Sequence, residues 1–76
     1  MTNNKYALAK NLAKNPNTPV KTLIFLSKDE NFYVRYLIAI NPNTPPKTLI
    51  TLSQDKDWFV RSILSKNPNY INKVTE

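Results

Sequence analysis

The 76-residue sequence contains no cysteine, no histidine and no glycine. Without cysteine the chain can form neither disulfides nor thiolate metal sites, and without histidine it lacks the commonest general base and the commonest metal ligand. The absence of glycine argues against tight hairpins and phosphate-binding loops, because both depend on backbone conformations that glycine adopts most easily. These absences weigh against a disulfide scaffold, a metal centre and a nucleotide-binding loop.

The chain also lacks a long apolar run. The longest runs, at residues 23–26 and 37–40, are far shorter than the roughly 20 residues that a membrane-spanning helix needs. The first residues contain no apolar core of signal-peptide length. We therefore expect a cytoplasmic protein without a membrane segment, folded around the hydrophobic residues that make up 41% of the chain.

Acidic residues are scarce. Five aspartates and glutamates stand against 11 lysines and arginines, which leaves a formal net charge of +6. This balance favours an acidic partner, such as nucleic acid, an acidic protein or an anionic surface, although solubility alone also accounts for scattered lysines. The acids form no obvious inward-facing pair and no serine stands beside a base, so we expect no enzyme activity and no cofactor.

The most prominent feature that the sequence does contain is a repeat. Residues 15–40 and 41–66 align without gaps and are identical at 14 of 26 positions, and residues 8–19 match residues 34–45. A third Asn-Pro-Asn begins at Asn67. The units run over about 1–14, 15–40 and 41–66, with a closing segment at 67–76. A fixed period in the twenties is typical of a solenoid, in which each unit buries its apolar face against its neighbours.

Each unit is predicted to begin with a short helix. Thr18 and Thr44 are placed to cap it, and a proline follows each of them at the first helical position. The helix is expected to end near Lys28 and Gln54. Its apolar face comprises Val20, Leu23, Ile24, Leu26 and Ser27 in one unit, and Pro46, Leu49, Ile50, Leu52 and Ser53 in the next.

A second short helix is predicted to follow in each unit. Asn31 and Asp57 cap helices over about 32–40 and 58–66, and the prolines at 42 and 68 end them. An initial helix near 4–14 and a closing turn near 70–75 complete the chain. No segment shows the two-residue alternation of a strand, so the predicted fold class is all-α.

Residues 34–61, VRYLIAINPNTPPKTLITLSQDKDWFVR, resemble the leucine-rich repeat variant family, and the resemblance covers essentially the whole chain. The matching positions are Val34-Arg35, Ala39, Asn41-Pro42, Thr44-Pro45, Leu49, Leu52, Asp55 and Val60-Arg61. The spacing from Asp29 to Arg35, repeated from Asp55 to Arg61, also resembles HEAT repeats. The resemblance implies a short right-handed helical-repeat solenoid, an α–α superhelix, of nearly three 26-residue units. The iron–sulfur cluster of some family members is excluded because the chain has no cysteine.

The outer units are more polar than the middle one. The first copy of the second helix carries Lys10, Asn11 and Lys14, where the middle copy is apolar nearly all round, and the last copy carries Ser62 and Ser65. Terminal units of a repeat array need such a polar face. We therefore expect residues 1–76 to form one complete domain with a polar cap at each end.

The first hypothesis for function is a protein-binding module, an adaptor or inhibitor. Phe25 points away from the apolar face of its helix, and its partner in the next unit is the polar Thr51. With Tyr36 it is the best candidate for an exposed apolar contact, flanked by Lys21 and Lys47. Aromatic side chains of this kind dominate the binding energy of protein interfaces.

Two other functions stay open. Lys21, Lys47 and Lys73 occupy the same position in successive units, and with Lys28 they would form a row that engages the phosphates of a nucleic acid. No recognised nucleic-acid motif accompanies them. The third hypothesis is self-association, since short arrays gain stability by stacking end to end.

The remaining repeated side chains have structural interpretations as well as functional ones. Arg35 and Arg61 suit an anion site, but a ladder with Asp29 and Asp55 between units is the favoured interpretation. The equivalent aromatic residues are expected to staple neighbouring units; they are Tyr6, Phe32 and Trp58 in one column, and Tyr33 and Phe59 in another.

Overall fold

The computed structural model describes residues 4–70 of the chain. This part of the chain forms five α-helices and one short 3₁₀ helix, and it contains no strand, which confirms the all-α prediction. The helices are α1 (Lys5–Lys14), α2 (Val20–Leu26), α3 (Phe32–Ile40), α4 (Pro46–Leu52), α5 (Trp58–Ser62) and η1 (Leu64–Lys66). Most of the closing turn expected at 70–75, together with Lys73, lies outside the described residues.

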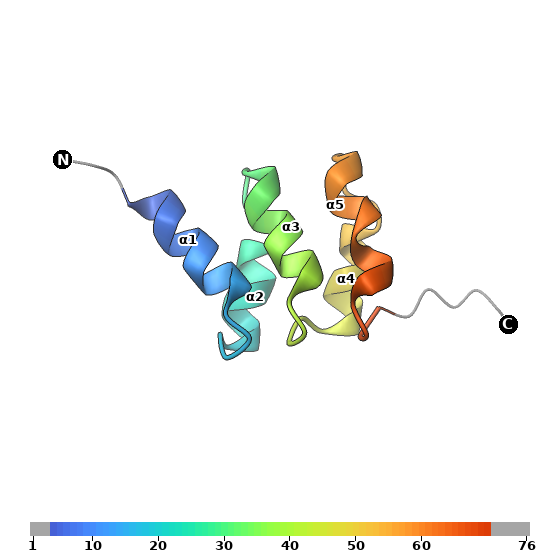
Figure 1. Ribbon diagram of the computed structural model, residues 1–76, viewed down its shortest axis with the longest axis horizontal. Coiled ribbons are helices and arrows are strands. Elements are labelled where there is room, and N and C mark those ends of the chain that lie inside the picture. Colours follow the sequence, from blue (N-terminus) through green and yellow to red (C-terminus); the bar gives the residue numbers. More distant parts are fainter. Residues whose placement is uncertain (1–3, 71–76) are drawn as a thin grey trace, which may run out of the picture.

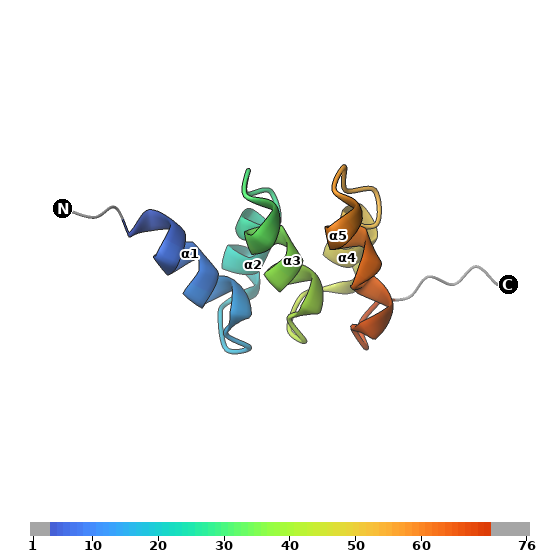
Figure 2. The same ribbon diagram turned by 45° about the horizontal axis from the view of Figure 1, so that its top comes forward.

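The helices form two layers. Helices α1, α3 and α5 lie side by side in one row, and α2 and α4 lie behind them (Figures 1 and 2). Within the first row, α1 packs against α3 and α3 against α5. Helix α2 contacts both α1 and α3, so the second layer packs against the first. Helix α1 stands at one end of the row and packs mainly against α2 and α3.

The helices of the first row begin where the sequence predicts. The Asn31 side chain accepts hydrogen bonds from the amides of Tyr33 and Val34, at 2.8 and 3.3 Å, so it caps α3. Asp57 caps α5 by accepting from the Phe59 amide at 2.8 Å. These bonds satisfy amide donors that have no partner inside the first helical turn.

The predicted caps of α2 and α4 are wrong. The residues that precede these helices are Pro19 and Pro45, and neither Thr18 nor Thr44 accepts a hydrogen bond from an amide of the helix that follows. Both threonines are buried, and their hydroxyls donate backward to main-chain carbonyls of the preceding helix, Thr18 to Leu12 at 2.7 Å and Thr44 to Ile38 at 2.8 Å. The threonines therefore close the end of one helix instead of starting the next.

The last helix is shorter than predicted. We expected one helix over 58–66, but α5 ends at Ser62 and a 3₁₀ turn follows from Leu64. The Ser62 hydroxyl donates to the Phe59 carbonyl at 2.8 Å, a local bond by which serine weakens a regular helix. A tightened last turn of this kind is common at helix ends.

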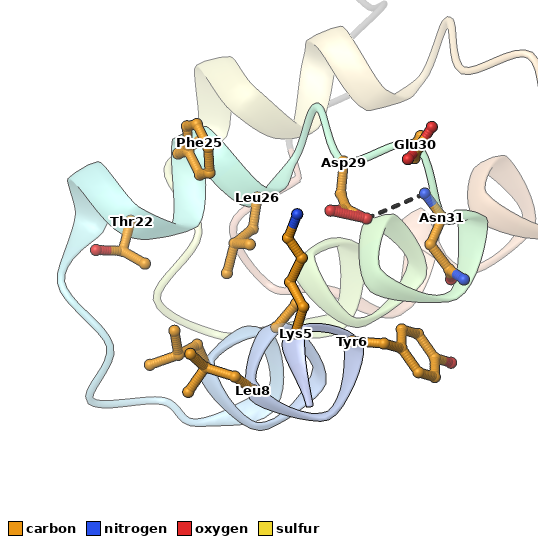
Figure 3. Close-up of a pocket in the computed structure, with 11 residues that line it drawn as sticks. Lys5, Tyr6, Leu8, Thr22, Phe25, Leu26, Asp29, Glu30 and Asn31 are labelled. Atoms are coloured by element: carbon orange, nitrogen blue, oxygen red, sulfur yellow. Dashed lines mark hydrogen bonds between the residues drawn. The ribbon is translucent and has the colours of Figure 1, made fainter. Parts of the chain in front are cut away.

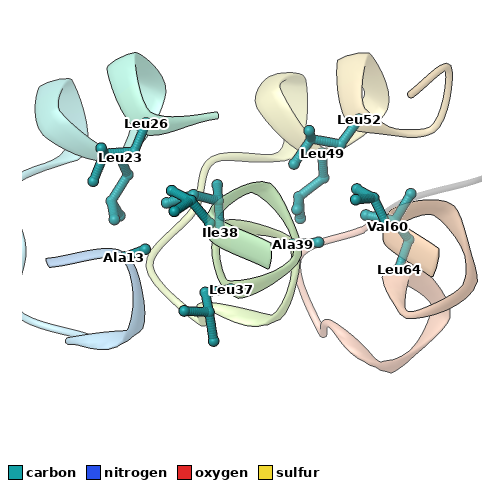
Figure 4. Close-up of a cluster of buried hydrophobic side chains, with 11 residues drawn as sticks. Ala13, Leu23, Leu26, Leu37, Ile38, Ala39, Leu49, Leu52, Val60 and Leu64 are labelled. Atoms are coloured by element: carbon teal, nitrogen blue, oxygen red, sulfur yellow. The ribbon is translucent and has the colours of Figure 1, made fainter. Parts of the chain in front are cut away.

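The core lies between the two layers. Leucines from α2 and α4 project toward the first row, where they meet apolar side chains of α3, α5 and η1 (Figure 4). The buried core consists of Ala13, Leu23, Leu26, Val34, Leu37, Ile38, Ala39, Leu49, Leu52, Val60 and Leu64. Val20, Ile24, Pro46 and Ile50 were expected on the buried face but are exposed, because the buried face is a narrow one formed by the two leucines of each helix with Ser27 and Thr48.

Neither a membrane segment nor a metal cluster is found in residues 4–70. No helix there combines the length and the apolar character that crossing a bilayer requires. Nor do three acidic side chains converge anywhere in the same residues to form a site for a metal ion.

Candidate protein-binding groove

Asparagine side chains join the repeated units. The Asn41 amide donates to the main-chain carbonyls of Ala13 at 2.8 Å and Asn15 at 3.0 Å. One unit later, Asn67 donates to Ala39 at 2.8 Å and to Asn41 at 2.9 Å. The acceptors lie 28 and 26 residues earlier in both cases, so the same pair of bonds recurs one repeat further along the molecule.

The same asparagines also hold their own loops. The side-chain oxygen of Asn41 accepts from the Asn43 amide at 2.8 Å, and that of Asn67 accepts from the Asn69 amide at 2.9 Å. Asn15 makes this local bond with Asn17, as the sequence predicts for an asparagine before proline, but it is exposed. Asn41 and Asn67 are buried, so their amides gain the most from being fully bonded.

A buried ion pair reinforces the contact between units. The Arg35 guanidinium binds the Asp55 carboxylate through two bonds, from Nε at 2.8 Å and Nη2 at 3.1 Å, and both side chains are more than nine-tenths buried. Nη1 of Arg35 donates to the main-chain carbonyls of Asp29 and Glu30, at 2.8 and 3.1 Å. Arg61 makes the equivalent main-chain bond to Asp55. The ladder expected from Arg35, Arg61, Asp29 and Asp55 thus contains one carboxylate pair, between Arg35 and Asp55. The other bonds run from the arginines to the main-chain carbonyls of Asp29 and Asp55.

The ion pair changes the ionisation of Asp55. Burial raises the pKa of this carboxyl, but the hydrogen bond from Arg35, the bond from the Asp57 amide and the charges of Arg35 and Lys56 outweigh burial. The net result is a pKa below the ordinary value of 3.8. Asp55 is therefore held as a carboxylate across the physiological range, which is the form that binds a guanidinium.

Tyr36 does not form the exposed contact that the sequence suggested. Its ring is half-buried and stacks between Tyr33, at 5.7 Å between centroids, and Phe59, at 4.3 Å. Phe32 meets the edges of Tyr33 and Phe59 at 6.5 and 5.7 Å. Tyr36 is thus covered by Phe59, which the next unit supplies, so the aromatic cluster joins α3 to α5.

A groove opens at the free end of the row, beside α1. It has a volume of about 840 Å³ and is formed by α1, by α2 and by the loop at residues 29–31 (Figure 3). Its lining is mostly apolar and includes Leu8, Leu12, Phe25 and Leu26. Acidic residues Asp29 and Glu30 stand at the loop end, and Lys5 extends from α1 toward Asp29 (Figure 3).

The floor of the groove repeats a surface that is covered elsewhere. Leu8 is equivalent to Val34 and Val60, each 26 residues further along, and both valines are fully buried while Leu8 is 59% exposed. Leu12 is half-buried, whereas its equivalent Ile38 is fully buried. The internal equivalents are covered because helices of the second layer lie over them. The groove is therefore the place that a further second-layer helix would occupy before α1.

The wall of the groove formed by α2 leads to the same conclusion. Between α2 and α4, the side of α4 that faces α2 carries Lys47, Thr48 and Thr51. The equivalent residues of α2 are Lys21, Thr22 and Phe25, and Thr22 and Phe25 line the groove. Phe25 is 75% exposed, the highest value among the exposed large hydrophobic side chains of the described residues. Asn11 and Lys14, two of the polar residues expected at this end, are exposed on α1, while the groove beside them has this apolar wall.

The ion-pair pattern is also incomplete at this end. Asp29 is equivalent to Asp55, whose partner Arg35 comes from the preceding first-row helix. The residue equivalent to Arg35 in α1 is Ala9, and Ala9 and Asp29 line the groove together. A methyl group therefore stands where the internal unit places a guanidinium, which widens the groove next to a carboxylate.

The structure brings only two of the row-forming lysines together. Lys28 and Lys47 line one small hollow of about 220 Å³ between α2 and α4. Lys21 is exposed on α2, four residues before Phe25 and so on the same face as that ring. Lys73 lies outside the described residues. The expected row of lysines therefore cannot be traced as one line along a flank.

Two residues of the sequence indicate the groove, but only when they are considered together. Phe25 in place of a threonine and Ala9 in place of an arginine are both departures from the repeat. They lie 16 positions apart, and only the packing of α1 beside α2 shows that they share one cavity. Comparisons of the chain with protein-family models, with curated proteins and with solved structures found no match.

Proposed function

We propose that the chain is a short helical-repeat solenoid of the leucine-rich repeat variant or HEAT-like type, and that it binds another protein through the N-terminal groove. The asparagine and Arg35–Asp55 contacts support the repeat architecture, because the asparagine bonds recur at equivalent positions 26 residues apart and the ion pair joins successive units. The fold by itself does not specify a function. The proposal that the chain binds another protein is therefore argued from the groove and not from the fold.

The observation that carries the proposal is the exposure of Leu8 and Phe25 in one apolar groove. The equivalents of Leu8 are fully buried and the equivalent of Phe25 is a threonine, so the repeat does not need these exposed apolar groups. Aromatic and leucine side chains in a concave surface are the usual source of binding energy at protein interfaces. Lys21, on the same helical face as Phe25, gives the groove a basic edge that favours an acidic rim on the partner.

The test compares two exposed aromatic residues. Phe25→Thr removes the groove aromatic and introduces the residue that the next unit carries at the same position, so the fold is expected to tolerate it. Trp58→Thr is the matched control, because Trp58 is 68% exposed and does not line the groove. Each protein is immobilised and its retained partners from the source cell are quantified.

We expect Phe25→Thr to reduce retention of a specific partner at least about tenfold and Trp58→Thr to leave it unchanged. Circular dichroism should show equal helicity for the three proteins. Equal retention by the wild type and Phe25→Thr would mean that the groove is not the binding surface.

Nucleic-acid binding is the second candidate, favoured by the shared hollow of Lys28 and Lys47 and by the net charge of +6. Phosphate contacts of this kind weaken steeply with salt. We expect a random oligonucleotide to bind at about 20 mM salt, to dissociate by about 200 mM, and to bind less well to a Lys28→Gln, Lys47→Gln variant. Absence of binding at low salt would exclude this function.

A further inference from the structure

We infer that the groove accepts a short amphipathic α-helix of another protein, with leucines at positions i and i+3 and a basic residue just after the second leucine. This inference rests on the proposed function and specifies the class of partner. Recognition of an amphipathic helix by an apolar groove is a common mode of peptide binding. We expect a helix in this groove because the molecule already contains short helices, α2 and α4, packed over its first row in the same way. These two helices serve as the template for the bound helix.

The template is the second layer of helices. Helix α2 lies against α1 and α3, and α4 lies against α3, which is how a helix in the groove would lie against α1. Leu8 and Leu12 of the groove floor are the equivalents of Val34 and Ile38, which the second layer covers. A helix that entered the groove would continue the row of α2 and α4 by one position.

The leucine spacing follows from the same template. Helix α2 buries Leu23 and Leu26, and α4 buries Leu49 and Leu52, while the residues between them are mostly exposed. Two leucines three residues apart lie on one face of a helix, so two such anchors suffice to fill the space between the layers. Figure 4 shows both pairs pointing from the second layer toward the first.

The charge of the groove sets the direction of the bound helix and its basic residue. A helix parallel to α2 ends beside the loop that carries Asp29 and Glu30. The carbonyl end of a helix is itself negative, so a basic side chain there is stabilised both by the helix and by these carboxylates. Asp55 shows that a carboxylate at this repeat position holds a cationic side chain, since it binds Arg35. Ala9 is smaller than the arginine at the equivalent internal position, so the space beside Asp29, which Lys5 also approaches (Figure 3), is wider there.

A second copy of the chain is a poorer occupant. The helices of residues 4–70 that carry the leucine pair are α2 and α4, and both bury it in their own core. The opposite end of the row carries Ser62 and Ser65, which are exposed and polar, where the middle unit has Tyr36 and Ala39. Stacking that end onto the groove would cover apolar side chains with hydroxyls.

The experiment uses a peptide copy of the template. Residues 15–28, NPNTPVKTLIFLSK, with both ends blocked and a fluorophore attached, contain both leucines and Lys28. The control peptide carries Leu23→Ala and Leu26→Ala. Fluorescence anisotropy measures the binding of each peptide to the whole 76-residue protein and to its Phe25→Thr, Trp58→Thr and Asp29→Asn variants.

We expect saturable binding of the leucine peptide, and dissociation constants at least about tenfold higher for the alanine peptide and for Phe25→Thr. Asp29→Asn should weaken binding about threefold and reduce its dependence on salt, and Trp58→Thr should have no effect. Equal binding of the two peptides, or no saturable binding at about 1 mM, would overturn the inference. A dimer of the free protein that Phe25→Thr dissociates would also overturn it, since a second copy would then fill the groove.

The two proposals can fail separately. A cellular partner that is lost with Phe25→Thr, combined with no difference between the two peptides, would support groove binding and exclude a helix of this class. If neither the partner nor the peptide depends on Phe25, groove binding itself is wrong.

Discussion

Leu8 and Val34 occupy the same position in successive units, yet Leu8 is 59% exposed and Val34 is fully buried. The difference comes from the second layer of helices, which covers α3 and leaves this part of α1 open. Phe25 and Ala9 border the same opening, and both depart from the residue that the repeat places there. Phe25 and Ala9, two of the departures from the repeat, therefore lie at one surface.

The asparagine bonds between units should contribute strongly to stability. Asn41→Ala removes two bonds to main-chain carbonyls and leaves the buried Ala13 carbonyl without this donor. We expect the free energy of unfolding to fall by about 2 kcal/mol, measured by urea denaturation followed by circular dichroism. Asn15→Ala is the matched control, because the exposed side chain of Asn15 makes only the local bond to Asn17, and the variant should lose about 0.5 kcal/mol. Equal losses would mean that the bonds between units do not stabilise the fold.

Asp55→Asn should be destabilising at neutral pH. The substitution leaves the Arg35 guanidinium buried without its counter-charge, and we expect a loss of about 3 kcal/mol in the free energy of unfolding. Chemical denaturation at pH 7 measures the loss. Asp57→Asn keeps an oxygen that can accept from the Phe59 amide, so this control should change stability by less than about 1 kcal/mol.

The effect of Asp55 should also depend on pH. Its pKa is lower in the folded protein than the ordinary value of 3.8, so the carboxylate stabilises the fold fully above that value. This contribution is lost as the pH falls through the lower, folded pKa. The stability difference between wild type and Asp55→Asn should therefore be constant from pH 7 to about pH 5 and shrink below about pH 4. A difference that stays constant to pH 2 would contradict the lowered pKa.

Ala9→Arg should introduce beside Asp29 the type of arginine–aspartate pair that Arg35 and Asp55 form. Ala9 and Asp29 line one groove, and Asp29 stands where Asp55 binds Arg35. We expect the variant to be more stable by about 0.5 kcal/mol, because the new pair is partly exposed. The gain should disappear when Asp29→Asn is added, which a double-mutant cycle measures. A gain that persists in the double variant would exclude an ion pair as its cause.

The aromatic cluster should stabilise the contact between α3 and α5. Phe59→Ala removes the ring that stacks on Tyr36 and meets the edge of Phe32, and we expect a loss of about 2 kcal/mol in thermal or chemical denaturation. Trp58→Ala, one residue earlier and 68% exposed, should change stability by less than about 0.5 kcal/mol. If the two variants lose the same amount, the stacking does not contribute beyond simple burial.

The helical pattern could be predicted from local rules. The bounds of α3 agree with the prediction because Asn31 caps its first turn and Pro42 follows its end. The same local rules gave a wrong prediction for two threonines. Thr18 and Thr44 are well placed for a cap by sequence, but their hydroxyls donate to carbonyls six residues earlier, a bond that depends on how the chain folds back.

The contacts between units could not be predicted in this way. An asparagine before proline, such as Asn41, is already explained by the bond that it makes within its own loop. Its bond to a carbonyl 28 residues away forms only when the units lie side by side. Tyr36 was predicted to be an exposed contact, but Tyr33 of its own helix and Phe59 of the next unit stack on the two sides of its ring. Phe25 has no such neighbour on its open side, and it remains exposed.

The most direct test of the groove is a titration of the ¹⁵N-labelled protein with the peptide of residues 15–28, followed by the backbone amide resonances. Shifts that concentrate at Leu8, Ala9, Thr22, Phe25 and Asp29, and that are absent with the peptide whose leucines are replaced, are the predicted result. Shifts that concentrate on α5, or that are the same for both peptides, would contradict the assignment of this groove as the binding site for a helix of another protein.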